Sequence, residues 1–294
     1  MFCSDVPDIE VVVPAEQLRA RMIEARALGA TAVEFSGLEP TLRADFVDLV
    51  REARHLGYQR IQVITNGRRF ADREFARAAV QAGLNSVLVS IHGDSAALEA
   101  SIVGTEQSWT EKRAGIENLQ AAFLATRISS KHHAFAILET NVVVTSANVD
   151  HLDPVVSFLA GLGIARINLY AARPFGWGNR NFDAAIPPIA AAGTAAVAAA
   201  RRARKMGTPA FVCDFPPCVL GDGADLAGSP EDKEVIAVLK SGKEQRLEGL
   251  TKKAIHKTKG APCETCAVEP ACEGVYREYV RRRGWSEIRA IPRA

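Results

Sequence analysis

The chain has 294 residues, enough for one large α/β domain with an appendage or for two ordinary domains. Apolar residues make up 48% and charged residues 24%, which is typical of soluble globular proteins and excludes disordered, collagenous and membrane-embedded classes. The formal net charge is +2, so overall charge selects no partner class, and we expect neither a membrane nor a nucleic-acid partner. Residues 201–294 are modestly basic, with 18 basic against 13 acidic side chains.

The first residues and the cysteines bear on the cellular compartment. Residues 1–5 show neither the basic start nor the apolar core of a secretory signal, and the uncharged stretch 184–200 is too weakly apolar to span a bilayer. Six cysteines in such a chain predict reduced thiols rather than a disulfide framework. We therefore expect a cytoplasmic protein.

Short β-rich runs alternate with amphipathic helical segments over the first two thirds of the chain. Strands are expected at Ala32–Phe35, Ile61–Thr65, Ser86–Ile91, Thr140–Thr145, Arg166–Tyr170 and Ala210–Phe215. Helices are expected at Pro14–Leu28, Leu42–Leu56, Asp72–Ala82, Thr110–Leu124, Val149–Leu162 and Pro188–Lys205. The repeat length is that of a βα step in a parallel barrel or a doubly wound sheet, so the pattern predicts an α/β fold.

Two features interrupt this repeat. First, a βα barrel begins with a strand, whereas here a helix precedes the first clear strand. Second, the composition of residues 125–139 predicts a polar loop or a short hairpin. The composition then changes near residues 206–216, after which glycine and lysine become frequent. We predict one domain over residues 1–206 and a small cysteine-rich domain over residues 207–294.

The strongest sign of chemistry is a C-x2-C-x5-C motif formed by Cys263, Cys266 and Cys272. Two intervening residues let two thiolates converge on one metal centre, and a third thiolate leaves one ligand to find. Cys218 is the natural fourth ligand, with Cys213 or His256 as substitutes. The spacing leaves zinc and an iron–sulfur cluster open, beside the alternative of inert buried thiols. The segment Glu273–Arg283 is expected to be a helix that packs beneath the cluster through Val275, Tyr279 and Val280.

Polar residues also end three consecutive predicted strands. Ser36–Pro40 follows the first strand, Thr65–Gly67 the second and Ser90–Gly93 the third, while Asn141 lies on the fourth. The carboxyl ends of parallel strands meet at one edge of a sheet, which is where ligands bind. Each segment can also be read as a plain turn, but their shared position predicts a ligand site.

In order and spacing, these motifs resemble the radical S-adenosylmethionine (SAM) enzymes. The resemblance covers about residues 1–180 and is carried by Phe35–Leu42, which is similar to the family's Gly-Gly-Glu-Pro loop, and by four further segments. These segments are Thr65–Gly67, Val89–Gly93, Gly115–Leu119 and Thr140–Val144. The C-terminal cysteine motif resembles the auxiliary-cluster extension, of the twitch or SPASM type, found in members that modify peptides and cofactors.

The resemblance implies a partial (β/α)6 barrel that binds SAM and a [4Fe–4S] cluster, with a second, auxiliary [4Fe–4S] cluster at the C-terminal cysteines. It implies one-electron cleavage of SAM to methionine and a 5′-deoxyadenosyl radical, which abstracts hydrogen from a peptide or small-molecule substrate such as a cofactor precursor. An electron donor such as a flavodoxin or a ferredoxin would be a partner.

Site residues follow from the resemblance by position. Gly37, Glu39 and Pro40 would hold the SAM amino group. Ser90 and Asn141 would face the ribose, whereas Thr65 and Asn66 would line the rim. Cys218, Cys263, Cys266 and Cys272 would bind the auxiliary cluster.

Two departures from the family pattern stand out. Leu38 replaces the second glycine and is strained if that position needs a positive φ. The family's C-x3-C-x2-C motif is missing, and only Cys3 lies at the expected place as a ligand of the SAM cluster. Together with the missing first strand, this predicts a chain truncated at its N-terminus and inactive as written. The alternative is a non-catalytic relative with a structural zinc site that acts as a binding protein.

Overall fold

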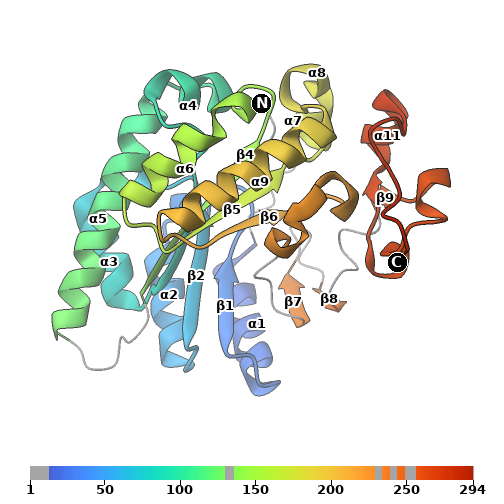
Figure 1. Cartoon of the computed structure of the whole chain (residues 1–294). Helices are drawn as coiled ribbons and strands as arrows, with labels where there is room; N and C mark the ends of the chain where they lie inside the picture. Colours follow the sequence, from blue (N-terminus) through green and yellow to red (C-terminus); the bar gives the residue numbers. More distant parts are fainter. Residues whose placement is uncertain (1–12, 130–135, 229–233, 239–243, 249–255, 294) are drawn as a thin grey trace.

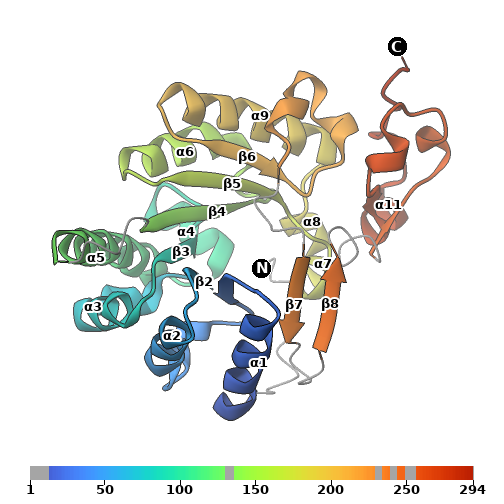
Figure 2. The same cartoon turned by 90° about the horizontal axis from the view of Figure 1, so that it is seen from below.

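A curved parallel sheet forms the centre of the molecule. The structure is a computed structural model that describes residues 13–129, 136–228, 234–238, 244–248 and 256–293. Six parallel strands follow one another in sequential order. They are β1 (Ala32–Phe35), β2 (Arg60–Thr65), β3 (Ser86–Ser90), β4 (Ile137–Val144), β5 (Arg166–Ala171) and β6 (Ala210–Cys213). Figure 2 shows the sheet as an open arc with its helices outside, so the predicted partial barrel is confirmed, and it is not closed.

Helices connect these strands and cover the outer face of the sheet (Figure 1). The longer helices are α1 (Ala15–Ala27), α2 (Phe46–His55), α3 (Arg73–Ala82), α4 (Ala96–Val103), α5 (Gln107–Ser129), α6 (Leu152–Gly161) and α9 (Ile189–Lys205). Two short helices, α7 (Gly176–Arg180) and α8 (Phe182–Ala185), follow β5. The sequence did not predict α4, and α5 continues into the predicted polar loop before β4 begins at Ile137.

The C-terminal part adds small elements on the open side of the arc. Strands β7 (Glu234–Val238) and β8 (Glu244–Glu248) form an antiparallel pair, as do β9 (Lys257–Thr258) and β10 (Val275–Tyr276), and α11 (Arg277–Arg283) follows. Strand β6 lies after residue 206 yet belongs to the main sheet. The division into residues 1–206 and 207–294 stays a prediction.

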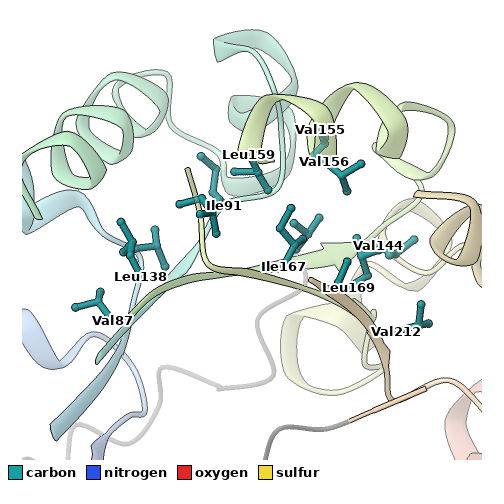
Figure 3. Close-up of a cluster of buried hydrophobic side chains, with 14 of the residues drawn as sticks. Val87, Ile91, Leu138, Val144, Val155, Val156, Leu159, Ile167, Leu169 and Val212 are labelled. Atoms are coloured by element: carbon teal, nitrogen blue, oxygen red, sulfur yellow. The ribbon is translucent and has the colours of Figure 1, made fainter. Parts of the chain in front are cut away.

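Apolar side chains fill the layer between the sheet and its helices. Figure 3 shows Ile167 and Leu169 of β5 and Val144 of β4 facing Val156 and Leu159 of α6. All five side chains are buried. Since alternate residues of a strand point to opposite faces, this pattern assigns the intervening residues to the concave face of the arc.

The concave face is polar. Glu34, Gln62 and Ser86 lie in one lateral row, where Gln62 Nε2 donates to Glu34 Oε2 at 2.6 Å and Ser86 Oγ donates to Gln62 Oε1 at 2.9 Å. One row further on, Glu139 and Arg166 form an ion pair of 2.6 Å. Parallel sheets that are packed on both faces are apolar throughout, so these rows indicate a lined interior rather than a second core.

Helix α9 is a core helix, although its composition is also that of a membrane span. The stretch Phe182–Lys205 is the one described segment that is long and apolar enough to cross a membrane. However, 56% of its apolar window is buried inside the protein. Alanines on one side of α9, including Ala196 and Ala199, pack in the central core. Packing therefore explains its composition.

The C-terminal segment caps α9. Pro188 precedes the helix and makes no side-chain cap. Instead, the Ile189 N–H donates to Tyr279 Oη at 2.8 Å, the Ala190 N–H donates to Glu287 Oε2 at 3.0 Å, and Tyr279 Oη donates to Glu287 Oε1 at 2.5 Å. These bonds satisfy backbone donors at the positive end of the helix. The expected helix Glu273–Arg283 was therefore wrong in two respects, because α11 begins at Arg277 and Tyr279 is directed to α9.

Gly115 allows α5 to lie directly against the loop after β2. A Cβ atom at Gly115 would lie 2.4 Å from the Gly67 carbonyl oxygen. One turn later, Asn118 Nδ2 donates to the carbonyl oxygens of Phe70 and Ala71, both at 3.0 Å. Helix α5 thus holds the loop that follows β2.

Gly115→Ala is therefore expected to lower the free energy of unfolding by about 1–3 kcal/mol, the usual cost of overpacking. At an unobstructed helix position the same change raises stability by about 0.5–1 kcal/mol. Gly161→Ala in α6 is the matched control, because no atom lies within 4 Å of the added Cβ. Urea denaturation measures both changes, and equal stabilisation by the two variants would contradict the close approach.

Candidate functional site

The loop after β1 carries an exposed backbone in an uncommon conformation. Gly37 has φ 92° and Leu38 has φ 34°. A leucine in this region is strained, as the sequence predicted, because its Cβ crowds the backbone. Its side chain is 62% exposed, so apolar burial does not offset the strain. No atom lies within 4 Å of a Cβ built on Gly37, which leaves room for a ligand beside this backbone.

The Glu39 carboxylate is bonded within the protein and joins two loops. Its Oε1 accepts from Thr41 N–H at 3.1 Å, Thr41 Oγ1 at 2.6 Å and Thr65 Oγ1 at 2.8 Å. Its Oε2 accepts from the Asn66 N–H at 2.6 Å. Pro40 is buried at the start of a 3-10 helix, Pro40–Leu42. With its carboxylate so occupied, Glu39 positions the loop, and the backbone of residues 36–38 is the part open to a ligand.

Thr65 and Asn66 shape the loop after β2. Thr65 Oγ1 accepts from the Gly67 N–H at 2.9 Å while it donates to Glu39. Asn66 Oδ1 accepts from the Arg68 N–H at 2.9 Å. Both residues therefore lie at the predicted rim, beside Glu39.

A buried ionic network shapes the loop after β3. Glu99 Oε2 accepts from the backbone N–H groups of His92 and Gly93 at 2.8 and 2.9 Å, and Lys112 Nζ donates to Glu99 Oε1 at 2.5 Å. The Glu99 and Lys112 side chains are 0% and 2% exposed. The Val143 N–H donates to His92 Nδ1 at 3.1 Å, which ties this loop to β4. Burial lowers the pKa of His92 to about 3, so the ring is neutral.

Ser90, Asn141 and Asn168 lie side by side on three neighbouring strands. The strand register pairs Ser90 with Asn141 and Asn141 with Asn168. Asn168 Nδ2 donates to Asn141 Oδ1 at 3.1 Å. Sequence reasoning missed Asn168, although an asparagine inside an apolar strand is the kind of signal that could have identified it.

Four thiols line one cavity in the C-terminal segment. Cys218, Cys263, Cys266 and Cys272 border one hollow together with apolar side chains such as Val268, Val275 and Ile288. The structure thus brings together cysteines that are up to 54 residues apart in sequence. The two substitutes lie elsewhere: Cys213 Sγ donates to the Gly228 carbonyl oxygen, and the His256 ring packs on Phe175. Cys3 lies outside the described residues.

Backbone donors point at the cysteine sulfur atoms. The Gly274 N–H donates to Cys272 Sγ at 3.3 Å, the Ile291 N–H donates to Cys266 Sγ at 3.4 Å, and Arg289 supplies a backbone hydrogen bond to Cys218. Burial and the neighbouring thiol groups raise the pKa of Cys218 and Cys272. Four thiolates are therefore stable together only with a cation among them.

The four thiols share one hollow but do not form a ready-made single-ion site. Among the residues that the structure describes, no three Cys, His, Asp or Glu side chains form such a site. A [4Fe–4S] cluster places a different iron at each cysteine, so its ligands surround a larger volume.

A second ion pair, in which the Asp214 carboxylate is buried and the Arg173 side chain is 35% exposed, joins the sheet to the C-terminal segment. Arg173, after β5, donates from Nε and Nη2 to Asp214 Oδ2 at 2.8 and 2.5 Å, and Tyr276 Oη donates to the same oxygen at 3.4 Å. Asp214 follows β6 with φ 66°, a costly conformation for a residue other than glycine. This junction lies at the carboxyl ends of two strands, and sequence reasoning did not identify it.

Residues 3–141 match the family model described as the radical SAM superfamily. The chain belongs to the radical SAM superfamily. This matches the family that its motifs resembled.

Individual relatives add detail. The PqqA peptide cyclase of Streptomyces rochei is 32% identical over 206 residues, which are 69% of this chain and 52% of that protein. The chain thus spans about half the length of this curated relative. The solved structure of native anSMEcpe with bound AdoMet and Kp18Cys peptide has a TM-score of 0.61 at 15% identity, over 91% of this chain and 82% of that one. Streptococcus suis SuiB has a TM-score of 0.52 at 14% identity, over 73% and 46%. At these identities both structures show the fold alone.

Leu38→Gly is expected to relieve backbone strain. Leu42 is the matched control, because it is 75% exposed and lies in a 3-10 helix with ordinary φ. At a helical position such as Leu42, glycine costs about 0.5–1 kcal/mol of stability. In the left-handed region, where Leu38 lies, glycine relieves about 1–2 kcal/mol of backbone strain. In urea denaturation, Leu38→Gly should be about 1–2 kcal/mol more stable than Leu42→Gly. A lower stability of Leu38→Gly would show that the Leu38 side chain supports the loop.

His92 predicts a loss of stability in mild acid. Its pKa is about 3 in the folded protein and 6.5 in the unfolded chain, so the unfolded chain binds the proton first as the pH falls. The contribution of the neutral His92 ring to the free energy of unfolding is complete above pH 6.5 and decreases as the pH approaches 3. About 2 kcal/mol of that free energy is lost between pH 7 and 5. His92→Asn keeps an acceptor for the Val143 N–H and does not titrate. Its free energy of unfolding should therefore fall less over this pH range, and equal slopes would contradict the neutral ring.

Proposed function

We propose that the chain acts as a radical SAM enzyme that modifies a peptide. Membership of the superfamily supports the radical chemistry, and the relative that is named a PqqA peptide cyclase supports the peptide substrate. In this proposal a [4Fe–4S] cluster and SAM supply one-electron cleavage of SAM, which yields a 5′-deoxyadenosyl radical for hydrogen abstraction. A flavodoxin or a ferredoxin would deliver the electron.

The SAM site in this proposal is the concave side of the rim. The backbone of Gly37 and its neighbours would hold the SAM amino group, with Glu39 and Pro40 fixing that loop through their buried contacts. Thr65 and Asn66 would line the rim next to it, and Ser90 and Asn141 would face the ribose. Cys3 would be one ligand of the SAM cluster.

The C-terminal cysteines would bind an auxiliary [4Fe–4S] cluster of the twitch or SPASM type. The single observation that carries this assignment is the cavity lined by four thiols, three of whose sulfur atoms receive backbone hydrogen bonds. Hydrogen bonds to the sulfur atoms and an apolar wall are the features by which a protein tunes such a cluster. The Arg173–Asp214 pair and Tyr276 would hold this cluster against the rim where the peptide is modified.

SAM cleavage tests the enzyme proposal. Because the sequence as written is expected to be inactive, the test uses the chain extended at its N-terminus by the two further cysteines of a C-x3-C-x2-C motif that ends at Cys3. This protein is reconstituted anaerobically with iron and sulfide, reduced with dithionite and given SAM. The expected products are 5′-deoxyadenosine and methionine in equal amounts, measured by chromatography. Protein left without iron is the control. Full SAM binding with no cleavage would instead favour a non-catalytic relative.

Iron content tests the auxiliary cluster. Cys263→Ala with Cys266→Ala is expected to remove about four irons per chain and the visible absorbance of that cluster. Cys213→Ala is the matched control and should retain them, because Cys213 Sγ is bonded to Gly228 outside the cavity. One bound zinc and no iron uptake at these cysteines would contradict the cluster and support the structural zinc alternative.

A further inference from the structure

Helix α11 packs beside the short helices α7 and α8. Arg282 Nη2 donates to the Asn179 carbonyl oxygen at 3.3 Å and to Asn179 Oδ1 at 3.1 Å, and the Arg282 guanidinium lies 4.8 Å from the centre of the Phe182 ring. Both cartoon views place the three helices on the same side of the molecule (Figure 1, Figure 2). Their exposed side chains form what we call the α7–α11 surface, which consists of Trp177, Arg180, Arg277, Arg281 and Arg282.

The α7–α11 surface carries an excess of positive charge. Helices α7, α8 and α11 contain five basic side chains and two acidic ones. Glu278 accepts from Arg281 Nε at 2.9 Å and from Arg282 Nε at 3.1 Å, so one carboxylate serves two guanidinium groups. Arg180 forms no ion pair with a described residue and lies over the Trp177 ring at 5.0 Å. Positive charge is therefore left for a partner that carries carboxylates.

The chemistry of this surface suits a polypeptide. Trp177 is 39% exposed and Arg281 is 67% exposed. Tryptophan and arginine are the residue types that most often dominate the binding energy of protein interfaces. Here an exposed indole ring lies beside several guanidinium groups, so the surface complements a chain that carries both apolar and acidic side chains.

The α7–α11 surface is continuous with the rim of the sheet. Helix α7 begins shortly after β5 ends, and between them Arg173 lies over the Tyr170 ring at 5.9 Å. Tyr170 belongs to the concave face, because alternate residues of β5 pack in the core. Phe175, directly before α7, contacts the Tyr276 ring, directly before α11, at 5.1 Å. A peptide that leaves the concave face beside β5 therefore meets α7 and α11 next.

We propose that the α7–α11 surface binds an acidic segment of the peptide substrate, outside the residue that is modified. This inference rests on the proposed function, which assigns a peptide to the rim. Carboxylates of that segment pair with Arg180 and Arg281, and an apolar side chain contacts Trp177. The excess positive charge attracts an acidic peptide and selects it over neutral ones.

Fluorescence anisotropy of the full chain tests this surface without turnover. The probe is a fluorescein-labelled peptide of alternating glutamate and leucine, and the reference peptide has glutamine at each glutamate position. Arg180→Gln with Arg281→Gln removes two positive charges without placing a carboxylate beside Glu278. Arg73→Gln with Arg77→Gln is the matched control, because it removes two exposed positive charges from α3, on the opposite side of the molecule in Figure 1.

The wild type is expected to bind the acidic peptide about tenfold more tightly than the glutamine peptide, the value of roughly two exposed ion pairs. This preference should disappear at about 1 M salt, where the Debye length is only about 3 Å. The surface double variant should lose the preference, whereas the α3 double variant should retain it. Trp177→Ala should weaken the binding of both peptides, since the contact that it removes is apolar. If the surface double variant unfolds, Arg180→Gln alone gives the same comparison with about a threefold effect.

Three outcomes would overturn the inference. Equal affinity of the wild type for the two peptides would show that no acidic site exists, and equal losses in the two double variants would show unspecific attraction. Binding of an oxidised flavodoxin but not of the acidic peptide, with loss of that binding in the surface variant, would assign the surface to the electron donor. SAM cleavage is measured separately, so the enzyme proposal stands in all three cases. If the acidic peptide binds as expected and SAM is not cleaved, the enzyme proposal fails and the acidic-peptide site stands.

Discussion

The four hydrogen bonds accepted by the Glu39 carboxylate are the interaction on which the rim depends. Two of them come from Thr41 in the same loop, and the other two, from Thr65 and Asn66, join the loop after β1 to the loop after β2, two segments that are separated by a whole helix in sequence. A single anionic group can do this because each of its oxygen atoms accepts several donors. The strained backbone of Leu38 is adjacent to Glu39 in sequence. The hydrogen bonds of the Glu39 carboxylate therefore hold the loop in a conformation that it would not adopt without them.

Buried charges repeat this device around the arc. Glu99 organises the loop after β3 with Lys112 from α5, and Asp214 organises the end of β6 with Arg173. Each pair lies beside the carboxyl end of a strand and binds backbone or side-chain donors from another element. The Glu99–Lys112 pair is fully buried, so it adds little net stability, but breaking it leaves a charge without a partner, which costs about 3–5 kcal/mol. The Arg173–Asp214 pair is partly exposed, so solvent reduces this cost there. Such pairs therefore restrict the rim to one arrangement.

The cysteine cavity depends on the rest of the molecule for its position. Tyr279 and Glu287 cap α9, and Tyr276 contacts Asp214, so the segment that carries three of the four cysteines is attached to the sheet at two points. Cys218 comes from the chain that leaves β6. A cluster at this cavity would consequently join the main sheet to the C-terminal segment, and ligation would contribute to the folding of both.

Local signals were enough to predict most of the sheet. Short β-rich runs between amphipathic helical segments identified all six strands, because the strand residues that pack beneath the helices are apolar. Helix α4 was missed since Ala96–Val103 carries the buried Glu99 on an otherwise short, uniformly apolar segment. Cysteine spacing located the C-terminal cavity for the same local reason: two ligands three residues apart must converge.

The remaining features involve partners that are distant in sequence. The residues at the rim are predicted to contact a ligand, and the structure adds that Glu39 accepts hydrogen bonds from Thr41, Thr65 and Asn66. Neither Asn168 nor Asp214 belongs to a sequence motif. Only the folded structure shows that the Asn168 Oδ1 atom lacks a donor among the described residues and that Asp214 pairs with Arg173. By itself the sequence determined which segments become strands and helices and which thiols converge. Only the tertiary structure decided which polar groups are already satisfied and which are left to a ligand, because hydrogen bonds depend on neighbours that the chain order does not bring together.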